Sequence, residues 1–166
     1  SPIIDNYTDS LLTSNCTNDK DCDGVTDKYD KCPEIAGDIR NYGCPLTTTT
    51  SKWRGDIKVA PIHFVSGATY ITDFSKGRLA KLINILNENE NLSVWLFGHT
   101  DAKGSSEINQ IISEKRVKTV VNYLIDNGIS PNRIFSIGFG ETFPVSFGRT
   151  EEDLLLNRRI DFYLFE

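Results

Sequence analysis

Strand-like and helix-like apolar patterns alternate through residues 52–166, and this alternation restricts the chain to folds that mix both elements. Runs of β-branched and aromatic residues predict strands at about 58–64, 92–97, 134–139 and 159–165. Apolar residues spaced three and four apart predict helices at about 72–87 and 106–126, and a short helical turn is expected at about 151–156. The side chains expected to face inward from the second helix are Ile108, Ile112, Val117, Val120, Val121 and Leu124. The order βαβαβ(α)β predicts an α+β fold, a two-layer sandwich with a mixed four-stranded sheet and its helices on one face.

The composition is that of a soluble globular protein, with 39% hydrophobic and 25% charged residues. No stretch approaches the roughly 18–20 consecutive apolar residues that a membrane helix needs. The net charge of −5 argues against a nucleic-acid partner, because phosphate binding needs a basic surface. We therefore expect no direct membrane insertion by this segment, and we expect any membrane anchor to lie upstream of Ser1.

The cysteines divide the chain, because all four lie within the first 44 residues: Cys16, Cys22, Cys32 and Cys44. We expect a tail or linker at residues 1–15, a cysteine-rich linker at 16–51 and a folded domain at 52–166. An even number of cysteines in a short, loop-rich segment favours disulfides in an oxidising compartment. Three connectivities are open, of which Cys16–Cys22 with Cys32–Cys44 is the most local. A zinc site made by the four thiolates is the alternative, disfavoured because the spacings are not CxxC pairs.

An acidic loop spans residues 19–30 and has the spacing of a calcium site. The predicted ligands are the carboxylates of Asp19, Asp21, Asp23, Asp27 and Asp30 and the backbone carbonyl of Val25. Hard oxygen ligands at these offsets converge on one cation, and Gly24 permits the sharp turn between them. A solvated acidic linker without metal is the alternative reading.

The residues that follow this loop separate it from an EF-hand. Asp30 stands at the last ligand position, and Lys31-Cys32-Pro33 comes next instead of a helical pattern. The segment 19–33 resembles a thrombospondin type 3 repeat, with the pattern DxDxDGxxDxxDxCP. The resemblance implies structural calcium, a periplasmic or extracellular location and a stiffened connector.

A second polar cluster surrounds the turn after the second predicted strand, which leads into a helix whose first N–H groups form an anion site. On that helix Asn109, Ser113 and Arg116 form a polar stripe with helical spacing. Asp101 in the turn and Arg116 can together hold a zwitterion, with the guanidinium on a carboxylate and Asp101 on an ammonium group. An internal Asp101–Arg116 salt bridge is the alternative. The Arg158–Arg159 pair before the last strand is, by itself, typical of a solvated sheet edge.

Five motifs follow one another in this part of the chain. They are Gly98-His99-Thr100-Asp101-x-x-Gly104-Ser105 with Asn109, Ser113-x-x-Arg116, Gly128-Ile129-x-x-x-Arg133-Ile134, Gly138-x-Gly140-Glu141-x-x-Pro144 and Asn157-Arg158-Arg159. In this order, over roughly residues 57–165, they resemble the OmpA-like peptidoglycan-binding domain that Pal lipoproteins and flagellar stator proteins share.

The resemblance implies a non-enzymatic domain that binds the diaminopimelate of the peptidoglycan stem peptide. It implies that the segment lies in the periplasm and anchors the bacterial outer membrane to the cell wall. It assigns Asp101 to the ligand ammonium group and Arg116 to its carboxylate. The residues that it places around the pocket are Thr100, Gly104, Asn109, Ser113 and Arg158.

Two other classes of function remain open. One is a calcium-dependent adhesion or protein-interaction module of the bacterial envelope, with the acidic linker as its active surface. The other is a metal-assisted wall hydrolase, which is disfavoured because His99 has only His63 as a second imidazole and no HExxH motif accompanies it.

Overall fold

The computed structural model describes residues 20–21, 27–28, 30, 33–34, 36–37 and 54–166. The chain divides into two compact units, Ser1–Ser51 and Lys52–Glu166. The predicted disulfides lie outside the described residues, as do the calcium ligands Asp19, Asp23 and Val25. The helices and strands described below belong to the second unit.

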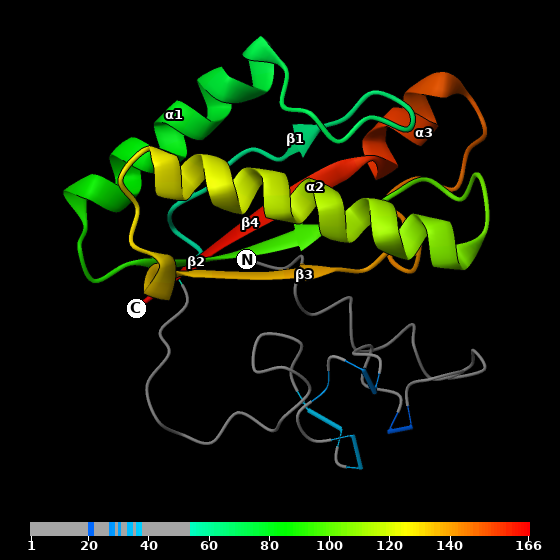
Figure 1. Ribbon diagram of the computed structural model, residues 1–166, viewed down its shortest axis with the longest axis horizontal. Coiled ribbons are helices and arrows are strands. Elements are labelled where there is room, and N and C mark those ends of the chain that lie inside the picture. Colours follow the sequence, from blue (N-terminus) through cyan, green and yellow to red (C-terminus); the bar gives the residue numbers. More distant parts are fainter. Residues whose placement is uncertain (1–19, 22–26, 29, 31–32, 35, 38–53) are drawn as a thin grey trace. The chain divides into compact units, whose positions relative to one another are not determined.

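The second unit contains four strands and three α-helices among its described residues (Figure 1). The elements are β1 (Ile62–His63), α1 (Asp73–Glu88), β2 (Ser93–Gly98), α2 (Ser106–Asp126), the 3-10 turn η2 (Pro131–Arg133), β3 (Ile134–Gly138), α3 (Glu151–Asn157) and β4 (Arg159–Phe165). Their order confirms the predicted α+β fold, and the bounds of α2 and β4 are those that the sequence predicts.

The sheet is mixed and has the strand order β1-β4-β2-β3. β4 lies between β1 and β2 and is antiparallel to both, whereas β2 and β3 are parallel and joined through α2. Figure 1 shows α1 and α2 along one face of this sheet, with α3 beside the start of β4. The parallel pair places the ends of β2 and β3 at the same edge, so the loops that follow both strands meet there.

One apolar core lies between the sheet and the two long helices. Leu79, Leu82 and Leu86 of α1 are fully buried, as the helical spacing predicts. They meet alternate side chains of the strands, among them Val94, Leu96, Ile160 and Leu164. Thr72 caps α1 by accepting a hydrogen bond from the Ser75 amide.

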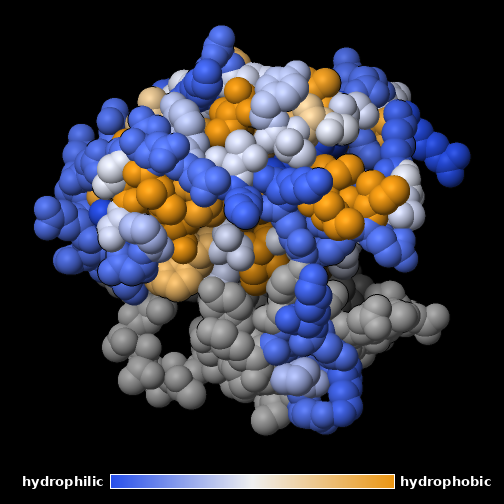
Figure 2. Space-filling view, viewed as in Figure 1, coloured by the Kyte–Doolittle hydropathy of each residue, from blue (hydrophilic) through white to orange (hydrophobic). Residues whose placement is uncertain are grey.

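Two expectations about packing are wrong. The first strand is only two residues long, because Pro61 has no N–H for the ladder and leaves pairing with β4 to the residues after it. Ile108 is 55% exposed rather than inward, and Figure 2 shows apolar side chains among the charged ones on the face that carries the helices. The inward face of α2 instead carries Asn109, Ser113 and Arg116 in its first half.

Arg133 joins the end of α1 to the sheet, which explains the presence of this arginine in the third of the five motifs. Its guanidinium donates to the carbonyls of Leu86 (2.7 Å), Asn89 (2.8 Å) and Leu92 (2.7 Å). The last carbonyls of a helix have no partner within it, so one arginine here satisfies several at once. Arg133 therefore stabilises the fold at the end of β2 opposite to Asp101.

Candidate functional site

Two glycines bring α2 close to the ends of β2 and β3. A Cβ atom on Gly98 would lie 2.4 Å from the Val117 side chain, and one on Gly138 would lie 2.6 Å from the Glu114 backbone nitrogen. Only a residue without a side chain permits this approach. The polar face of the first half of α2, made by Asn109, Ser113 and Arg116, is consequently buried against the sheet edge, where the loops after β2 and β3 meet.

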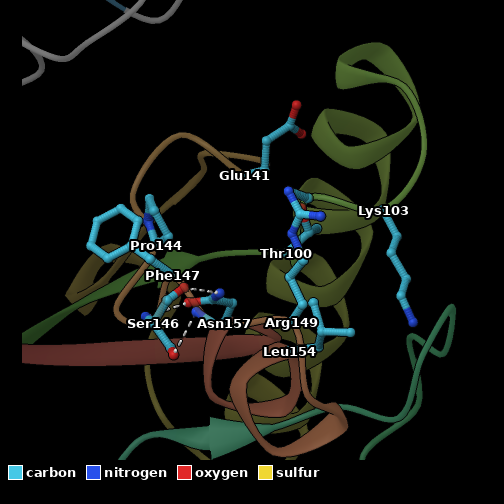
Figure 3. Close-up of a pocket in the computed structure, with 11 residues that line it drawn as sticks. Thr100, Lys103, Glu141, Pro144, Ser146, Phe147, Arg149, Leu154 and Asn157 are labelled. Carbon is cyan, nitrogen blue, oxygen red and sulfur yellow. Dashed lines mark hydrogen bonds between the residues drawn. The ribbon is translucent and has the colours of Figure 1, made fainter.

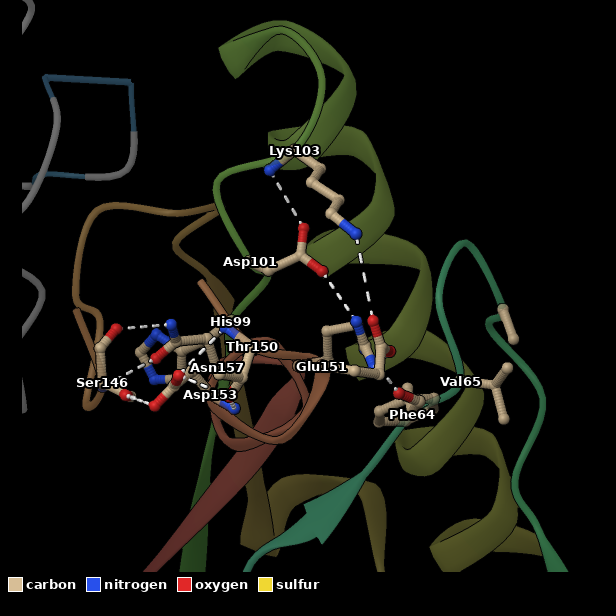
Figure 4. Close-up of polar contacts among 12 residues, drawn as sticks. Phe64, Val65, His99, Asp101, Lys103, Ser146, Thr150, Glu151, Asp153 and Asn157 are labelled. Atoms are coloured by element: carbon tan, nitrogen blue, oxygen red, sulfur yellow. Dashed lines mark hydrogen bonds and ion pairs between the residues drawn. The ribbon is translucent and has the colours of Figure 1, made fainter. Parts of the chain in front are cut away.

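Asp101 follows β2 and is 6% exposed. One carboxylate oxygen accepts the Lys103 amide at 3.0 Å, which folds the turn around it. The other accepts Nη1 of Arg158 at 2.9 Å. Figure 4 shows the Asp101 carboxylate and its contact with the Lys103 amide.

Arg158 is buried and connects three parts of the domain. Besides Asp101, its guanidinium donates to the Phe64 carbonyl after β1 at 3.0 Å and to the Glu151 carboxylate at the start of α3. Glu151 is largely exposed, and its second oxygen lies 3.9 Å from Lys103 Nζ. Arg158 and Arg159 are each 3% exposed, so the reading of this pair as a solvated edge is wrong.

Arg116 is 1% exposed and makes no ion pair with any carboxylate among the described residues. Its guanidinium donates to three backbone carbonyls, Ala68 at 2.9 Å and His99 and Val65 at 3.3 Å each. Its central carbon also lies 4.9 Å from the centre of the Phe64 ring. The domain therefore buries a guanidinium that only neutral groups contact.

Burial lowers the pKa of Arg116 to about 10, and the positive charge of Arg158 lowers it as well, whereas the negative charge of Asp101 opposes the shift. A guanidinium with a pKa near 10 is still a cation at neutral pH. The alternative of an Asp101–Arg116 salt bridge does not match this geometry, because Asp101 is bonded to Arg158. Arg116 thus has its charge uncompensated by direct contact.

Thr100 and Asn109 each bury a polar atom without a protein partner. These atoms are the Thr100 hydroxyl oxygen and the Asn109 amide nitrogen, on residues that are 4% and 2% exposed. A buried polar atom without a partner costs free energy, so such atoms are uncommon away from ligand sites. Both residues are among those that the sequence assigns to the site.

Gly104 and Ser113 stabilise the backbone around the Asp101 turn. Gly104 has a φ of 99°, in the left-handed region that favours glycine, and it closes the turn before α2. The Ser113 hydroxyl donates to the Gln110 carbonyl at 2.8 Å and accepts the Gly140 amide at 2.9 Å. Ser113 therefore holds the loop after β3 against α2.

A pocket of about 470 Å³ opens on the other side of the turn (Figure 3). Thr100 and Lys103 line it from the turn, Glu141 and Phe147 from the loop after β3, and Leu154 from α3. Neither Asp101 nor Arg116 lines it. The sequence singled out Glu141 only as part of a motif, and it gave no signal for Phe147 or Arg149, because loop residues without periodicity carry none.

The His99 side chain is buried beside this site, where it contacts Asp161 and Phe139. Its Nε2 is 3.4 Å from Asp161 of β4, and its ring stacks on Phe139 at 5.7 Å. Burial lowers the pKa of His99, so the imidazole is neutral at pH 7. Burial opposes ionisation of Asp161 too, but the hydrogen bond with His99 and the charge of Arg159 hold its pKa below the usual value.

Of the six predicted calcium ligands, the structure describes Asp21, Asp27 and Asp30. The Asp27 carboxylate accepts the Lys20 amide at 2.8 Å, which joins two residues seven positions apart in the loop. Within the described ranges, no three or more His, Cys, Asp or Glu side chains gather as a metal site. The helices that the structure describes include none long and apolar enough to cross a membrane.

Relatives of known identity resemble this chain in both sequence and structure. Outer membrane porin F of Pseudomonas aeruginosa is 30% identical over 146 residues, which cover 86% of this chain and 40% of that protein. The peptidoglycan-associated lipoprotein of the same organism is 38% identical over 68 residues, 41% of this chain and 40% of the relative. The chain thus spans well under half the length of both.

The crystal structure of the peptidoglycan-associated lipoprotein from Burkholderia pseudomallei shares the fold. It superposes with a TM-score of 0.61 at 24% identity, over 63% of this chain and 88% of that one. The sequence model of the OmpA family matches residues 63–158, which is more than half of the chain and includes the Asp101 turn, α2 and Arg158. The chain belongs to the OmpA family.

Proposed function

We propose that this domain binds peptidoglycan through the diaminopimelate residue of the stem peptide, without catalysis, and that it does so in the periplasm to hold an outer membrane to the cell wall. The observation that carries the proposal is the buried Arg116 cation next to the Asp101 turn, which has no carboxylate partner among the residues that the structure describes. The relatives named peptidoglycan-associated lipoprotein and outer membrane porin F support both the ligand and the location.

A ligand carboxylate suits the N–H groups of Arg116 that the three carbonyls leave over. A guanidinium has five N–H groups, and the three bonds to Ala68, His99 and Val65 use one each from Nε, Nη1 and Nη2. Each Nη therefore keeps one N–H, and a guanidinium can bind a carboxylate in bidentate form through its two Nη groups. The two Nη bonds are also the long ones, at 3.3 Å, so a ligand that displaces them costs little.

A ligand ammonium group suits Asp101. Each of its oxygens accepts one hydrogen bond, and a carboxylate oxygen has room for a second. The unpartnered Thr100 hydroxyl and Asn109 amide supply further polar contacts beside it. Diaminopimelate carries an ammonium and a carboxylate on one carbon at the end of its side chain, which is the pair of charges that Asp101 and Arg116 fit.

Access to both groups needs a movement, because Asp101 and Arg116 are 6% and 1% exposed. The segment that holds Arg116 is the loop after β1, through the carbonyls of Val65 and Ala68. Gly67 in this loop has a φ of 69°, and nothing lies within 4 Å of the position of an added Cβ atom, so the loop is loosely packed there. We propose that displacement of this loop admits the stem peptide.

The test compares two tripeptides that differ only in the group proposed for Arg116. The L-Ala-D-Glu-diaminopimelate peptide is expected to bind the chain at least about tenfold tighter than L-Ala-D-Glu-L-Lys by titration calorimetry, because the lysine peptide lacks the carboxylate. Asp101→Asn is nearly isosteric, but it removes the charge and replaces one of the two acceptor oxygens by an amide donor. It is expected to lower the affinity for the diaminopimelate peptide by about 30-fold or more.

Asp126→Asn is the matched control, because it makes the same change on an exposed carboxylate at the far end of α2. It should leave binding as in the parent chain. Equal affinity of the parent chain for the two tripeptides would falsify the assignment of Arg116. Equal loss in the Asp101 and Asp126 variants would remove Asp101 from the site.

We also propose that residues 19–30 bind one structural calcium ion. The donor set fits a hard cation, since it consists of five carboxylates and one carbonyl. The Asp27–Lys20 hydrogen bond supports a loop that is closed on itself, as a cation-binding loop must be. The ion would neutralise the crowded carboxylates of the loop and stiffen the linker that precedes the domain.

A further inference from the structure

The pocket beside the Asp101 turn is lined by neither Asp101 nor Arg116, but it has features of a ligand site. Its volume of about 470 Å³ is that of a small-molecule site. Thr100 lines it and is 4% exposed, and its hydroxyl oxygen has no hydrogen-bond partner in the part of the chain that the structure describes. The Glu141 Oε2 atom, on a second lining residue, is buried and unpartnered as well.

The walls of the pocket combine an aromatic side with a polar side. Figure 3 shows Phe147 and Pro144 on one side, Arg149 and Lys103 on the other, and Glu141 above. Phe147 is 88% exposed, which is unusual for so large an apolar side chain. An aromatic face with hydrogen-bonding groups opposite is the arrangement that suits a sugar ring, which has C–H groups on its faces and hydroxyl and amide groups at its edge.

Hydrogen bonds with Asn157 and Asp153 fix the loop that carries Phe147. Asn157, which is 5% exposed, accepts the amides of Val145 and Ser146 and donates to the Ser146 carbonyl. The Ser146 hydroxyl in turn donates to Asp153 at 2.6 Å (Figure 4). The exposed ring is therefore presented by an ordered loop, so that little conformational entropy is lost when a ligand binds.

The pocket and the proposed peptide site share the turn after β2. Thr100 and Lys103 line the pocket, and Asp101 between them in the sequence accepts a hydrogen bond from Arg158. L-Ala and D-Glu separate the diaminopimelate of a stem peptide from its attachment point, so the peptide would cross the turn between Asp101 and the pocket. In peptidoglycan that attachment point is an N-acetylated amino sugar, whose ether-linked side chain carries the first residue of the peptide.

We propose that this pocket binds the N-acetylated amino sugar that carries the stem peptide, so that the domain binds the glycan and the peptide at the same time. The inference rests on the proposed function. Phe147 supplies the stacking surface, and the Glu141 carboxylate accepts hydrogen bonds from sugar hydroxyl or amide groups. Lys103 and Arg149 donate to the carbonyl oxygens of the acetyl and lactyl groups.

The experiment compares a disaccharide tripeptide with the free tripeptide, both containing diaminopimelate, by titration calorimetry on the full chain. The parent chain is expected to bind the disaccharide tripeptide about tenfold tighter. Phe147→Ala is expected to lower that affinity by about three- to tenfold and to leave the affinity for the free tripeptide unchanged. Because Phe147 is 88% exposed, the variant keeps the fold.

Leu156→Ala is the control, since Leu156 is 48% exposed on α3 and does not line the pocket. It should behave as the parent chain with both ligands. Equal affinity of the parent chain for the two ligands overturns the sugar site and leaves the peptide site intact. An equal loss for both ligands in Phe147→Ala also overturns it. Binding of neither ligand to the parent chain overturns the proposed function and the sugar site with it.

Discussion

Replacing Arg158 by methionine is expected to lower the free energy of unfolding by about 3–5 kcal/mol, because the Asp101 carboxylate then stays buried without its cation. The two side chains are 4% and 8% exposed and lie 2.9 Å apart. The same change leaves the Phe64 carbonyl without its donor. Glu151, the other carboxylate on this guanidinium, is 68% exposed, so water replaces the lost contact there.

This contrast makes a double-mutant cycle informative. Combining Arg158→Met with Asp101→Asn is expected to recover about 2–3 kcal/mol relative to the sum of the single changes, because no buried charge is left alone. Combining it with Glu151→Gln is expected to recover less than about 1 kcal/mol, as for other exposed pairs. Urea denaturation at pH 7 measures both couplings. The reasoning is refuted if both couplings are the same size, or if the Asp101 pair is additive.

Three further predictions concern other parts of the chain. Burial lowers the pKa of His99 in the folded protein. The contribution of the neutral imidazole to the free energy of unfolding is therefore fully present above the unfolded pKa of about 6.5, and it is lost as the pH falls below that value. His99→Gln should therefore flatten the decline in urea midpoint between about pH 7.5 and pH 5, and an unchanged slope would contradict this. Gly138→Ala should destabilise by about 1–3 kcal/mol, because its Cβ atom would lie 2.6 Å from the Glu114 nitrogen. Gly77→Ala, in α1 with open space around the added atom, should instead stabilise by about 0.5–1 kcal/mol, and melting temperatures compare the two. Calcium should raise the melting temperature of the chain relative to chelator, and Asp21→Asn should reduce the rise; no rise would count against a bound ion.

The sequence predicts the fold well where periodicity and burial agree. Leu79, Leu82 and Leu86 show a helical spacing and are fully buried, because nothing competes with apolar packing on that helix. Ile160 and Leu164 alternate with more exposed residues, as in a strand with one face in the core. The first strand is the exception, since its length depends on Pro61 and on pairing with a strand about one hundred residues later.

The candidate site is the part that periodicity misrepresents. A helical pattern assigns the apolar side of α2 to the core, but Ile108 is exposed and Asn109 and Arg116 are buried. The cause lies outside the helix, in Gly98 and Gly138, whose lack of side chains lets the polar side approach the sheet edge. The motif resemblance predicts these residues as one group, whereas the partner of Asp101 depends on contacts with Arg158 that no spacing reveals.

The charges of Asp101, Arg116 and Arg158 link the stability of the domain to the proposed ligand. Asp101 neutralises Arg158, and Glu151 adds a negative charge only at the surface, so the buried part retains the charge of Arg116. A buried cation held by carbonyls alone is less stable than one with a counter-charge, and the lowered pKa of Arg116 expresses that cost. A carboxylate that reaches Arg116 removes the cost only when it brings its own cation to Asp101, because a lone anion would meet the Asp101 charge. The arrangement therefore favours a zwitterionic head group over either a simple acid or a simple amine.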